Sequence, residues 1–130
     1  MNFSKPQLIH PEFSYQLNGI LFAVHNERGR YCNEKQYGDA IEKYLKTYHL
    51  IYEREKVLPP SFAGEVAGRN KIDFVVDDKI LLELKTKRVL DRQDYYQTRR
   101  YLAALGIKLG ILVNFRDKFL RPRRVLNSNI

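Results

Sequence analysis

The sequence has few cysteines and histidines and no long apolar segment, which excludes several classes of protein. Its single cysteine, Cys32, excludes an internal disulfide and a zinc site built from cysteines, and we expect it to be an ordinary packed or surface residue. Its three histidines, His10, His25 and His49, complete no zinc triad. No apolar segment is long enough to span a membrane and no signal-peptide pattern is present, so we expect a cytoplasmic protein without a membrane partner.

Acidic residues are also outnumbered. The chain has 23 lysines and arginines against 15 aspartates and glutamates, a net charge of +8. This excess favours polyanions through counterion release, so nucleic acid is the expected partner class, although a basic surface also serves solubility alone. With 44% hydrophobic residues and 130 residues in all, we expect one globular domain over residues 1–130. Residues 1–12 are expected to be an extended lead-in, and residues 117–130 a basic tail.

The most informative segment is residues 71–85. It predicts two short apolar strands on either side of the polar turn 77–79. Asp73, Glu83 and Lys85 interrupt this apolar pattern, and a charged group buried without a partner is costly unless it becomes neutral. A divalent metal ion beside a lysine would account for all three residues.

The length of the turn decides whether the two carboxylates meet. Side chains alternate along a strand, so Glu83 and Lys85 share one face. A two-residue turn at 77–78 would leave Asp73 and Glu83 on opposite faces, whereas a three-residue turn at 77–79 places Asp73 opposite Glu83. We predict the three-residue turn, because only this register, or one restored by a bulge, lets both carboxylates reach one ion.

Helical spacing of apolar residues predicts two helices in the first part of the chain. The first runs from Ser14, as its cap, to about Gly29, and the second starts near Asn33, although one helix kinked at Gly29 fits equally. The two apolar stripes are Leu17, Ile20, Leu21 and Val24, then Tyr37, Ile41, Tyr44, Leu45 and Tyr48. Glu34 is expected to face inward at the start of the second helix, either toward a metal ion or only as a complement to the helix dipole.

The rest of the chain predicts strands and one further helix. Strands are expected at 50–58 and 107–115, with a helix capped by Asp91 between the hairpin and the second of them. The buried side of that helix is expected to be Tyr95, Thr98, Tyr101, Leu102 and Leu105. An edge strand is expected within 118–124, because Pro122 cannot sit in a central strand. The helix is long enough for a right-handed parallel crossover, so the predicted fold class is α/β, a central mixed β-sheet flanked by helices.

The hairpin also carries a family resemblance. Asp73 followed by Glu83-Leu84-Lys85 resembles the D…ExK signature of the PD-(D/E)XK nuclease superfamily, and the predicted order of elements resembles its αβββαβ core. The order of shorter motifs is similar to one branch, the GxxExxY family. The matching pieces are Asn18-Gly19, His25-Asn26-Glu27-Arg28-Gly29, Glu34-Lys35-Gln36-Tyr37, Ile72-Asp73, Leu82-Glu83-Leu84-Lys85, Gln97 with Tyr101-Leu102, and Leu112-Val113-Asn114-Phe115. The first glycine of the family pattern corresponds to Tyr31 here, with Gly29 nearby.

A second motif lies on the predicted third helix. Gln97 and Tyr101 are four residues apart, so they face the same way. They resemble the QxxxY motif that follows ExK in recombination-type exonucleases of the superfamily, which implies that they orient Lys85 and contact substrate phosphate. Taken alone, the same two residues are typical of a core tyrosine and a solvated glutamine.

The resemblance implies a nuclease that uses Mg²⁺ or Mn²⁺ to activate water for phosphodiester hydrolysis. The ligands would be Asp73, Glu83, the backbone carbonyl of Leu84, and Glu34 directly or through water. Lys85, with Gln97 beside it, would orient the water or stabilise charge on the phosphate. The residues expected to contact nucleic acid are Arg69, Lys71, Lys87, Arg88, Arg99, Arg100 and Tyr101.

DNA is favoured over RNA as the substrate of this expected nuclease. Two alternatives stay open: a non-catalytic nucleic-acid-binding module that retains the nuclease fold, and a structural subunit whose hairpin charges simply pair with each other. A chain of this size has little surface beyond the core with which to hold a duplex, so a homodimer or a partner protein is also considered.

Overall fold

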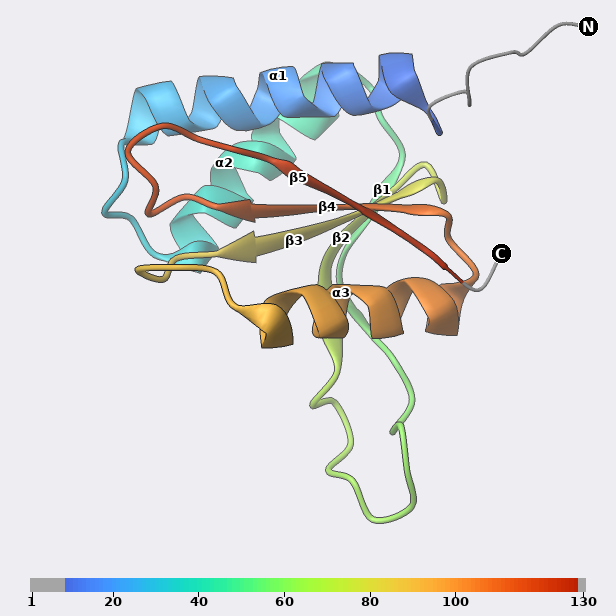
Figure 1. The fold of residues 1–130 in the computed structure, drawn as a ribbon. Helices are drawn as coiled ribbons and strands as arrows, with labels where there is room; N and C mark the ends of the chain where they lie inside the picture. The colour runs from blue at the N-terminus through green and yellow to red at the C-terminus, as the bar shows by residue number, and fades with distance from the viewer. Residues whose placement is uncertain (1–8, 129–130) are drawn as a thin grey trace, which may run out of the picture.

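The structure is a computed structural model, and it describes residues 9–128 (Figure 1). Its helices are α1 (Pro11–Arg28), α2 (Glu34–Thr47) and α3 (Arg92–Leu105), and its strands are β1 (Tyr52–Val57), β2 (Lys71–Val76), β3 (Ile80–Lys85), β4 (Leu109–Asn114) and β5 (Arg123–Leu126). The strands form one sheet in the order β1-β2-β3-β4-β5, in which only β3 and β4 are parallel. The predicted α/β class, with a mixed sheet, is confirmed.

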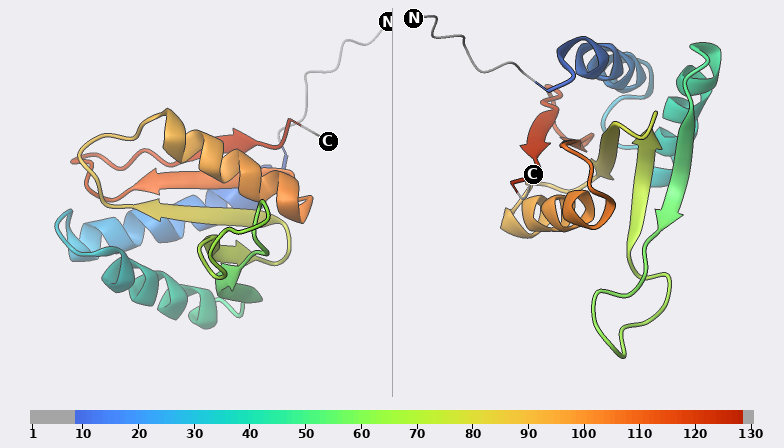
Figure 2. Two further views of the ribbon diagram at one scale, coloured as in Figure 1. Left: turned by 90° about the horizontal axis from the view of Figure 1, so that it is seen from below. Right: turned by 90° about the vertical axis from the view of Figure 1, so that its right-hand side faces the viewer.

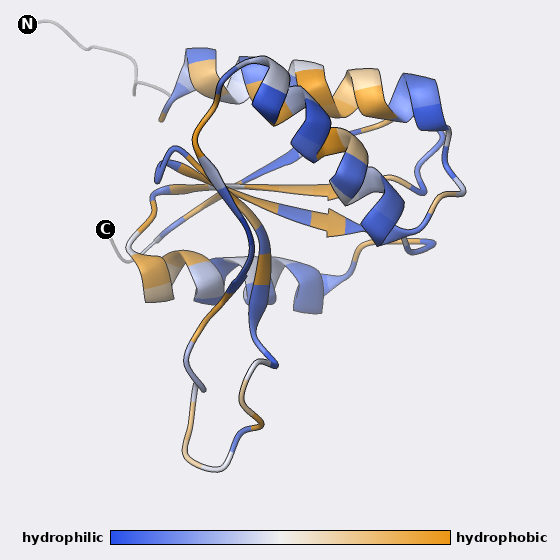
Figure 3. Cartoon of the chain, turned by 180° about the vertical axis from the view of Figure 1, so that it is seen from behind, coloured by the Kyte–Doolittle hydropathy of each residue, from blue (hydrophilic) through white to orange (hydrophobic). Residues whose placement is uncertain are grey.

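The sheet separates two hydrophobic cores. Helices α1 and α2 cover one face and α3 covers the other (Figure 2). The central strands are largely hydrophobic, whereas the outer side of α2 is hydrophilic (Figure 3). All six residues of β4 are buried, as expected for a strand that is covered on both faces. Within residues 9–128, no helix combines the length and the hydrophobicity needed to cross a membrane.

Helix α1 begins earlier than the sequence predicted. Pro11 occupies the first turn, where its missing N–H costs nothing, and His10 precedes it in a left-handed conformation. Ser14 is therefore a buried residue inside the helix and not its cap, and its hydroxyl donates to the Pro11 carbonyl. The expected lead-in thus ends before Pro11, and residues 1–8 lie outside the described part of the chain.

Helices α1 and α2 are separate and are joined through Gly29, whose φ of 74° suits glycine. Asn33 caps α2, and it forms a reciprocal capping box with Gln36. Tyr37 is buried, and its ring stacks on Phe115 with centroids 4.2 Å apart. Tyr48, predicted to complete the apolar stripe, is instead 51% exposed, because it lies at the C-cap, where the helix has already ended.

Helix α3 is held to the sheet by close packing. Asp91 caps it and shares a capping box with Asp94, as the start of this helix was predicted. Its buried side includes Thr98, and an added Cβ on Gly110 of β4 would lie 3.0 Å from the Thr98 methyl carbon. The crossover from β3 through α3 to β4 is parallel, as predicted, and the last strand begins just after Pro122, at the edge of the sheet.

Candidate active site

The register of the β2–β3 hairpin agrees with the predicted three-residue turn. Val75 pairs with Leu81, and the turn spans Asp77 to Lys79. Asp77 and Asp78 both have positive φ, a conformation that aspartate tolerates better than most residues. This register brings Asp73 opposite Glu83, as expected.

Asp73 and Glu83 meet where the backbone pairing of β2 and β3 ends. The last backbone pair is Phe74 with Leu82, and we call the region beyond it the fork. Across the fork, the N–H of Asp73 donates to Glu83 Oε1 at 3.1 Å, and the N–H of Leu84 donates to Asp73 Oδ2 at 2.7 Å. The two carboxylates therefore take the place of strand-to-strand backbone bonds.

The surroundings of both carboxylates disfavour their charged forms and so raise their pKa values. Burial raises the pKa of Asp73 to about 6, and the negative charge of Glu34 adds to this, while the hydrogen bond from Leu84 opposes it. Burial raises the pKa of Glu83 well above its ordinary value, and the charge of Asp73 raises it further. Neither forms an ion pair with any residue in the described part of the chain, so the alternative of hairpin charges that pair with each other is not supported.

Lys85 is held by a residue of α3, the helix that covers one face of the sheet. Its Nζ donates to Gln97 Oε1 of α3 at 2.9 Å, which is the contact that the QxxxY resemblance implied. Lys85 forms no ion pair with a described carboxylate, although its charge lowers the pKa of both Asp73 and Glu83 and so lies near them. Tyr101, by contrast, is a core residue with 4% of its surface exposed, which differs from the expected contact with nucleic acid.

A cleft of about 240 Å³ opens beside Asp73. Its lining consists of Glu34, Lys35, Gly38, Arg54, Glu55, Asp73, Phe74 and Leu84. Glu34 is exposed rather than inward-facing, because it occupies the first position of α2, but it still lines this cleft as the metal hypothesis required. Arg54 is engaged with Asp39 at 2.7 Å and Glu42 at 3.2 Å, so it does not neutralise the acids of the cleft.

Glu55 is a further carboxylate of this cleft that the sequence analysis did not identify. Its neighbours Arg54 and Lys56 pair with Phe74 and Ile72, which leaves Glu55 facing Asp73 without a backbone pair. Glu55 has a φ of 54°, a left-handed conformation that costs a non-glycine residue about 1–3 kcal/mol. The acid at the middle of the first strand was visible in the sequence, but only its register with β2 places it near Asp73.

The basic residues predicted to contact nucleic acid divide into two groups. Arg69, Lys71, Arg88, Arg99 and Arg100 are exposed, and Arg100 lines a cavity of about 330 Å³ together with Lys85, Gln97 and Tyr96. Lys87 instead bridges Asp91 and Asp94, at 3.0 Å from each carboxylate, so it holds the start of α3 in place. Its predicted role as a phosphate contact thus competes with this structural role.

The family of the chain follows from comparison with known proteins. A sequence model described as the PD-(D/E)XK nuclease superfamily matches residues 11–125. The chain belongs to the PD-(D/E)XK nuclease superfamily. Among solved structures, the chain is similar to an alkaline exonuclease (LHK-Exo) from Laribacter hongkongensis, with 14% identity, a TM-score of 0.49, and coverage of 99% of this chain and 73% of that one. No curated protein matches the sequence.

The donor set in this member of the superfamily suits a hard divalent cation, and nucleases of the superfamily generally use divalent metal ions. Asp73 and Glu83 supply carboxylate oxygens, and the Leu84 carbonyl points toward β2 because the N–H of the same residue does. Glu34 and Glu55 line the same cleft as Asp73. Mg²⁺ and Mn²⁺ favour such oxygen ligands and keep several waters. Within residues 9–128, no three or more His, Cys, Asp or Glu side chains gather closely enough to hold an ion by themselves.

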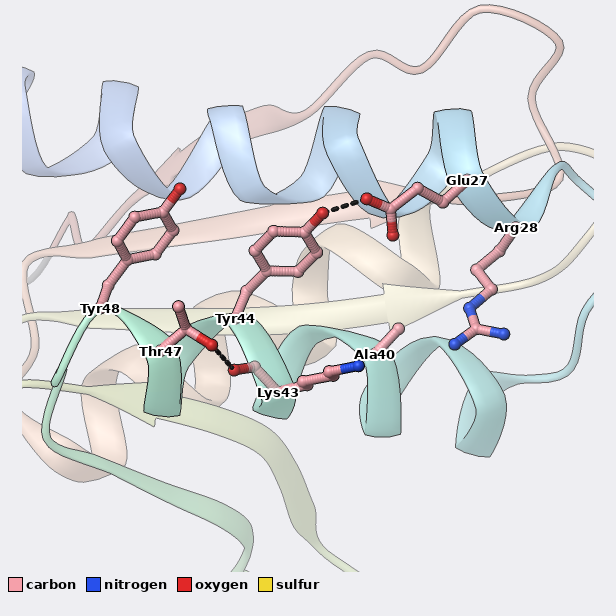
Figure 4. A pocket seen from close by; sticks show the side chains of 7 residues that line it. All are labelled: Glu27, Arg28, Ala40, Lys43, Tyr44, Thr47 and Tyr48. Carbon is pink, nitrogen blue, oxygen red and sulfur yellow. Dashed lines mark hydrogen bonds between the residues drawn. The ribbon is translucent and has the colours of Figure 1, made fainter.

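Another cavity of this PD-(D/E)XK protein lacks these features. It has a volume of about 270 Å³ and lies between α1 and α2 (Figure 4). Its lining consists of Glu27, Arg28, Ala40, Lys43, Tyr44, Thr47 and Tyr48. The Tyr44 hydroxyl donates to the Glu27 carboxylate, so this acid has a partner and is not paired with a second acid. The acids at the fork therefore mark the better candidate for the active site.

Proposed function

We propose that the protein is a Mg²⁺- or Mn²⁺-dependent nuclease that hydrolyses phosphodiester bonds of nucleic acid, with DNA favoured over RNA. The observation that carries the proposal is the link between Asp73 and Glu83 across the fork, where the backbone N–H of Asp73 donates to the Glu83 carboxylate. The Asp73 carboxylate is half-buried and that of Glu83 is buried, and neither has a described cationic partner. Two such acids are held together at a cost unless a cation shares them. The net charge of +8 supports a polyanionic substrate.

Each residue of the fork has a defined part in this proposal. Asp73, Glu83 and the Leu84 carbonyl would hold the ion, and Glu34 and Glu55 would bind its waters from the far side of the cleft. A bound divalent ion lowers the pKa of a coordinated water and so makes hydroxide available near neutral pH. Lys85, whose direction is set by Gln97, would donate a hydrogen bond to the attacking oxygen or to the phosphate as negative charge accumulates there.

The alternative of a non-catalytic nucleic-acid-binding module keeps the fold and requires no turnover. A module that only binds nucleic acid does not need two adjacent acids, Asp73 and Glu83, or a lysine whose Nζ is hydrogen-bonded to a glutamine. The presence of this whole set therefore favours the enzyme. The GxxExxY branch, a cytoplasmic location, and a homodimer or partner protein stay predictions of the sequence.

Calorimetric titration with Mn²⁺ tests the ion site first. Wild type is expected to bind Mn²⁺, and Asp73→Ala is expected to lose this binding. Asp78→Asn is the matched control, because Asp78 is an exposed acid in the turn of the same hairpin and asparagine tolerates its positive φ. Absence of binding to wild type would remove the metal-dependent proposal altogether.

Cleavage is then tested with Mg²⁺ on plasmid and on labelled single and double strands of DNA and RNA. Lys85→Ala is expected to bind Mn²⁺ like wild type and to cleave at least about 100-fold more slowly. Equal cleavage by the two proteins would indicate a contaminating nuclease. Retained binding of nucleic acid without any cleavage by wild type would favour the non-catalytic module.

A further inference from the structure

Two arginines from distant parts of the chain bind each other at the end of the sheet where β3 and β4 finish. Arg30 lies in the connection between α1 and α2, and Arg116 follows β4. The Nε of Arg30 donates to the Arg116 carbonyl at 2.9 Å, and the Nε of Arg116 donates to the Arg30 carbonyl at 2.8 Å. This reciprocal pair fixes the position of both guanidinium groups.

Both guanidinium groups lie on the ring of Tyr31. The guanidinium carbon of Arg30 is 5.3 Å from the ring centroid, and that of Arg116 is 5.4 Å from it. Tyr31 is 76% exposed, so the arrangement is on the surface and open to a large ligand. Cation–π contacts of this kind orient a guanidinium without neutralising its charge.

Neither arginine has an acidic partner in the part of the chain that the structure describes. Within residues 9–128, neither Arg30 nor Arg116 forms an ion pair, and only their Nε atoms make hydrogen bonds through the side chain. Arg54 is the contrasting case, because its guanidinium is paired with Asp39 and Glu42. Two like charges held together without a counter-ion are costly, and the outer Nη groups of both arginines are left to donate to an anion.

The pair lies at the same end of the sheet as Lys85. The N–H of Phe115 donates to the Lys85 carbonyl at 2.9 Å, and the N–H of Arg116 donates to Asn114 Oδ1 at 3.3 Å. Asn114 is the residue opposite Lys85 in the β3–β4 register. Figure 1 shows the α1–α2 connection, the ends of β3 and β4, and the segment after β4 side by side at the left of the molecule.

We propose that Arg30 and Arg116, held on Tyr31, form a phosphate clamp that binds a phosphate group of the nucleic-acid substrate beside the cleavage site. This inference rests on the proposed function for the choice of ligand. A phosphate has enough acceptor oxygens to bridge two guanidinium groups, and arginine binds phosphate through paired donors in a fixed geometry. The phosphate can be a terminal monoester or an internal diester, since both present the same oxygens.

The first test is binding of labelled oligonucleotides in EDTA, where no cleavage occurs, followed by fluorescence anisotropy. The double variant Arg30→Gln, Arg116→Gln is expected to lose roughly tenfold or more in affinity, equally across sequences, because phosphate contacts carry no sequence information. The slope of log K against log salt is expected to become shallower by about one or more. The matched control is Lys108→Gln, an exposed cation before β4 at the opposite end of this strand.

Two arms of this experiment identify the source of the phosphate. If the clamp takes a terminal monoester, wild type binds phosphorylated ends more tightly than hydroxyl ends, and the double variant does not distinguish them. If the clamp takes an internal diester, the double variant loses affinity equally for both. An oligomer with an uncharged backbone is expected to show no difference between the two proteins. Unchanged binding of charged oligonucleotides by the double variant would overturn the proposal.

If the double variant does not fold, the change in Tm that inorganic phosphate produces tests the clamp instead. Inorganic phosphate, compared with chloride at equal ionic strength, is expected to raise the Tm of wild type by roughly 2 °C, since a ligand of the native state stabilises it. Arg116→Lys keeps the charge but loses the planar fork, so its shift is expected to be smaller. No shift for wild type would overturn the clamp.

The same measurements separate this inference from the proposed function. Asp73→Asn is expected to lose Mn²⁺ binding and to keep the shift in Tm that inorganic phosphate produces. If wild type binds no Mn²⁺ and cleaves nothing, the nuclease proposal fails while the phosphate shift still reports the clamp. If Mn²⁺ binding and cleavage are present but the double variant binds and responds to phosphate like wild type, only the clamp fails.

Discussion

The backbone N–H of Asp73 donates a hydrogen bond to the carboxylate of Glu83, across the point where β2 and β3 separate. In return, Asp73 accepts from the N–H of Leu84, the residue that follows Glu83. Both acids thus carry backbone bonds of the sheet as well as their proposed role toward the ion. Removal of the charge alone and removal of the whole side chain are therefore expected to have different consequences at either position.

Removal of the Asp73 charge is expected to stabilise the metal-free protein near neutral pH. The pKa of this carboxyl is raised from 3.8 to about 6, so the native state holds more protons than the unfolded state between these values. Stability therefore falls as the pH rises through this window, and the loss persists above it. Asp73→Asn is expected to gain roughly 1–3 kcal/mol over wild type at about pH 7.5 and little at about pH 4. Urea unfolding in EDTA measures the difference; parallel pH profiles for the two proteins would contradict it.

Ion binding is expected to depend on pH in the opposite direction. The carboxylates must lose their protons before they hold a cation, and the pKa of Asp73 is about 6 while that of Glu83 is raised well above its ordinary range. Affinity for Mn²⁺ is therefore expected to rise as the pH increases above about 6. Calorimetry in two buffers of different ionisation enthalpy is expected to show proton release on binding. A pH-independent affinity without proton release would place the ion elsewhere.

Gln97 is expected to be a positioning residue for Lys85. Gln97→Ala removes the acceptor 2.9 Å from the lysine Nζ, and we expect cleavage to slow by about tenfold or more with Mn²⁺ binding unchanged. Gln97→Glu keeps an acceptor and is expected to recover part of the rate with an altered pH profile. Gln93→Ala is the matched control, because Gln93 lines the same cavity one turn earlier and the hydrogen bond of the Lys85 Nζ goes to Gln97 instead. A loss of equal size in that control would indicate a general effect on α3.

Two glycines are expected to respond in opposite ways to alanine. A Cβ at Gly110 would lie 3.0 Å from the Thr98 methyl carbon, so Gly110→Ala is expected to destabilise the fold by about 1–3 kcal/mol. Gly19 lies in α1 with no neighbouring atom within 4 Å of an added Cβ, so Gly19→Ala is expected to stabilise it by up to about 1 kcal/mol. Denaturant midpoints for both variants test the close packing of α3 on β4. A stabilising Gly110→Ala would show that the two elements can separate at no cost.

The left-handed backbone at Glu55 is expected to store strain. Glycine adopts its φ of 54° freely, so Glu55→Gly is expected to stabilise the metal-free protein by roughly 1 kcal/mol relative to Glu55→Ala. Both variants remove the carboxylate that faces Asp73 across the cleft, so both are expected to bind Mn²⁺ more weakly. The stabilities of the two variants thus report the cost of the left-handed backbone conformation, and their Mn²⁺ affinities report the contribution of the carboxylate to ion binding. Equal stabilities for glycine and alanine would mean that residue 55 relaxes.

The sequence predicted the elements that depend on local pattern. The hairpin register followed from the requirement that Asp73 and Glu83 share a face, and Asp91 and Asn33 were recognised as the residues where helices start. The parallel crossover followed from its length alone. The helix starts were therefore visible within a few residues, whereas the register depended on the alternation of side chains along the strands and the crossover on the length of the connection.

Other features depend on contacts that local pattern does not record. Glu55 joins the cleft only because β1 pairs with β2 in one particular register. Ser14 is not the predicted cap, because the helix already begins at Pro11, three residues earlier. Tyr101 is buried in the core, as its apolar spacing predicted, whereas the motif resemblance had suggested a contact with substrate. Arg30 and Arg116 are 86 residues apart, so their pairing becomes visible only when the chain is folded.

The burial of strand β4 determines where in the molecule local opening is expected to be rare. It is covered on both faces and bonded on both sides, so its amide hydrogens should exchange with solvent more slowly than those of the edge strands β1 and β5. At the fork, side-chain acceptors replace the regular ladder, and local opening there should require far less free energy. β4 would then stay rigid while the fork opens easily, so that binding of an ion could order the fork without a change in the rest of the fold.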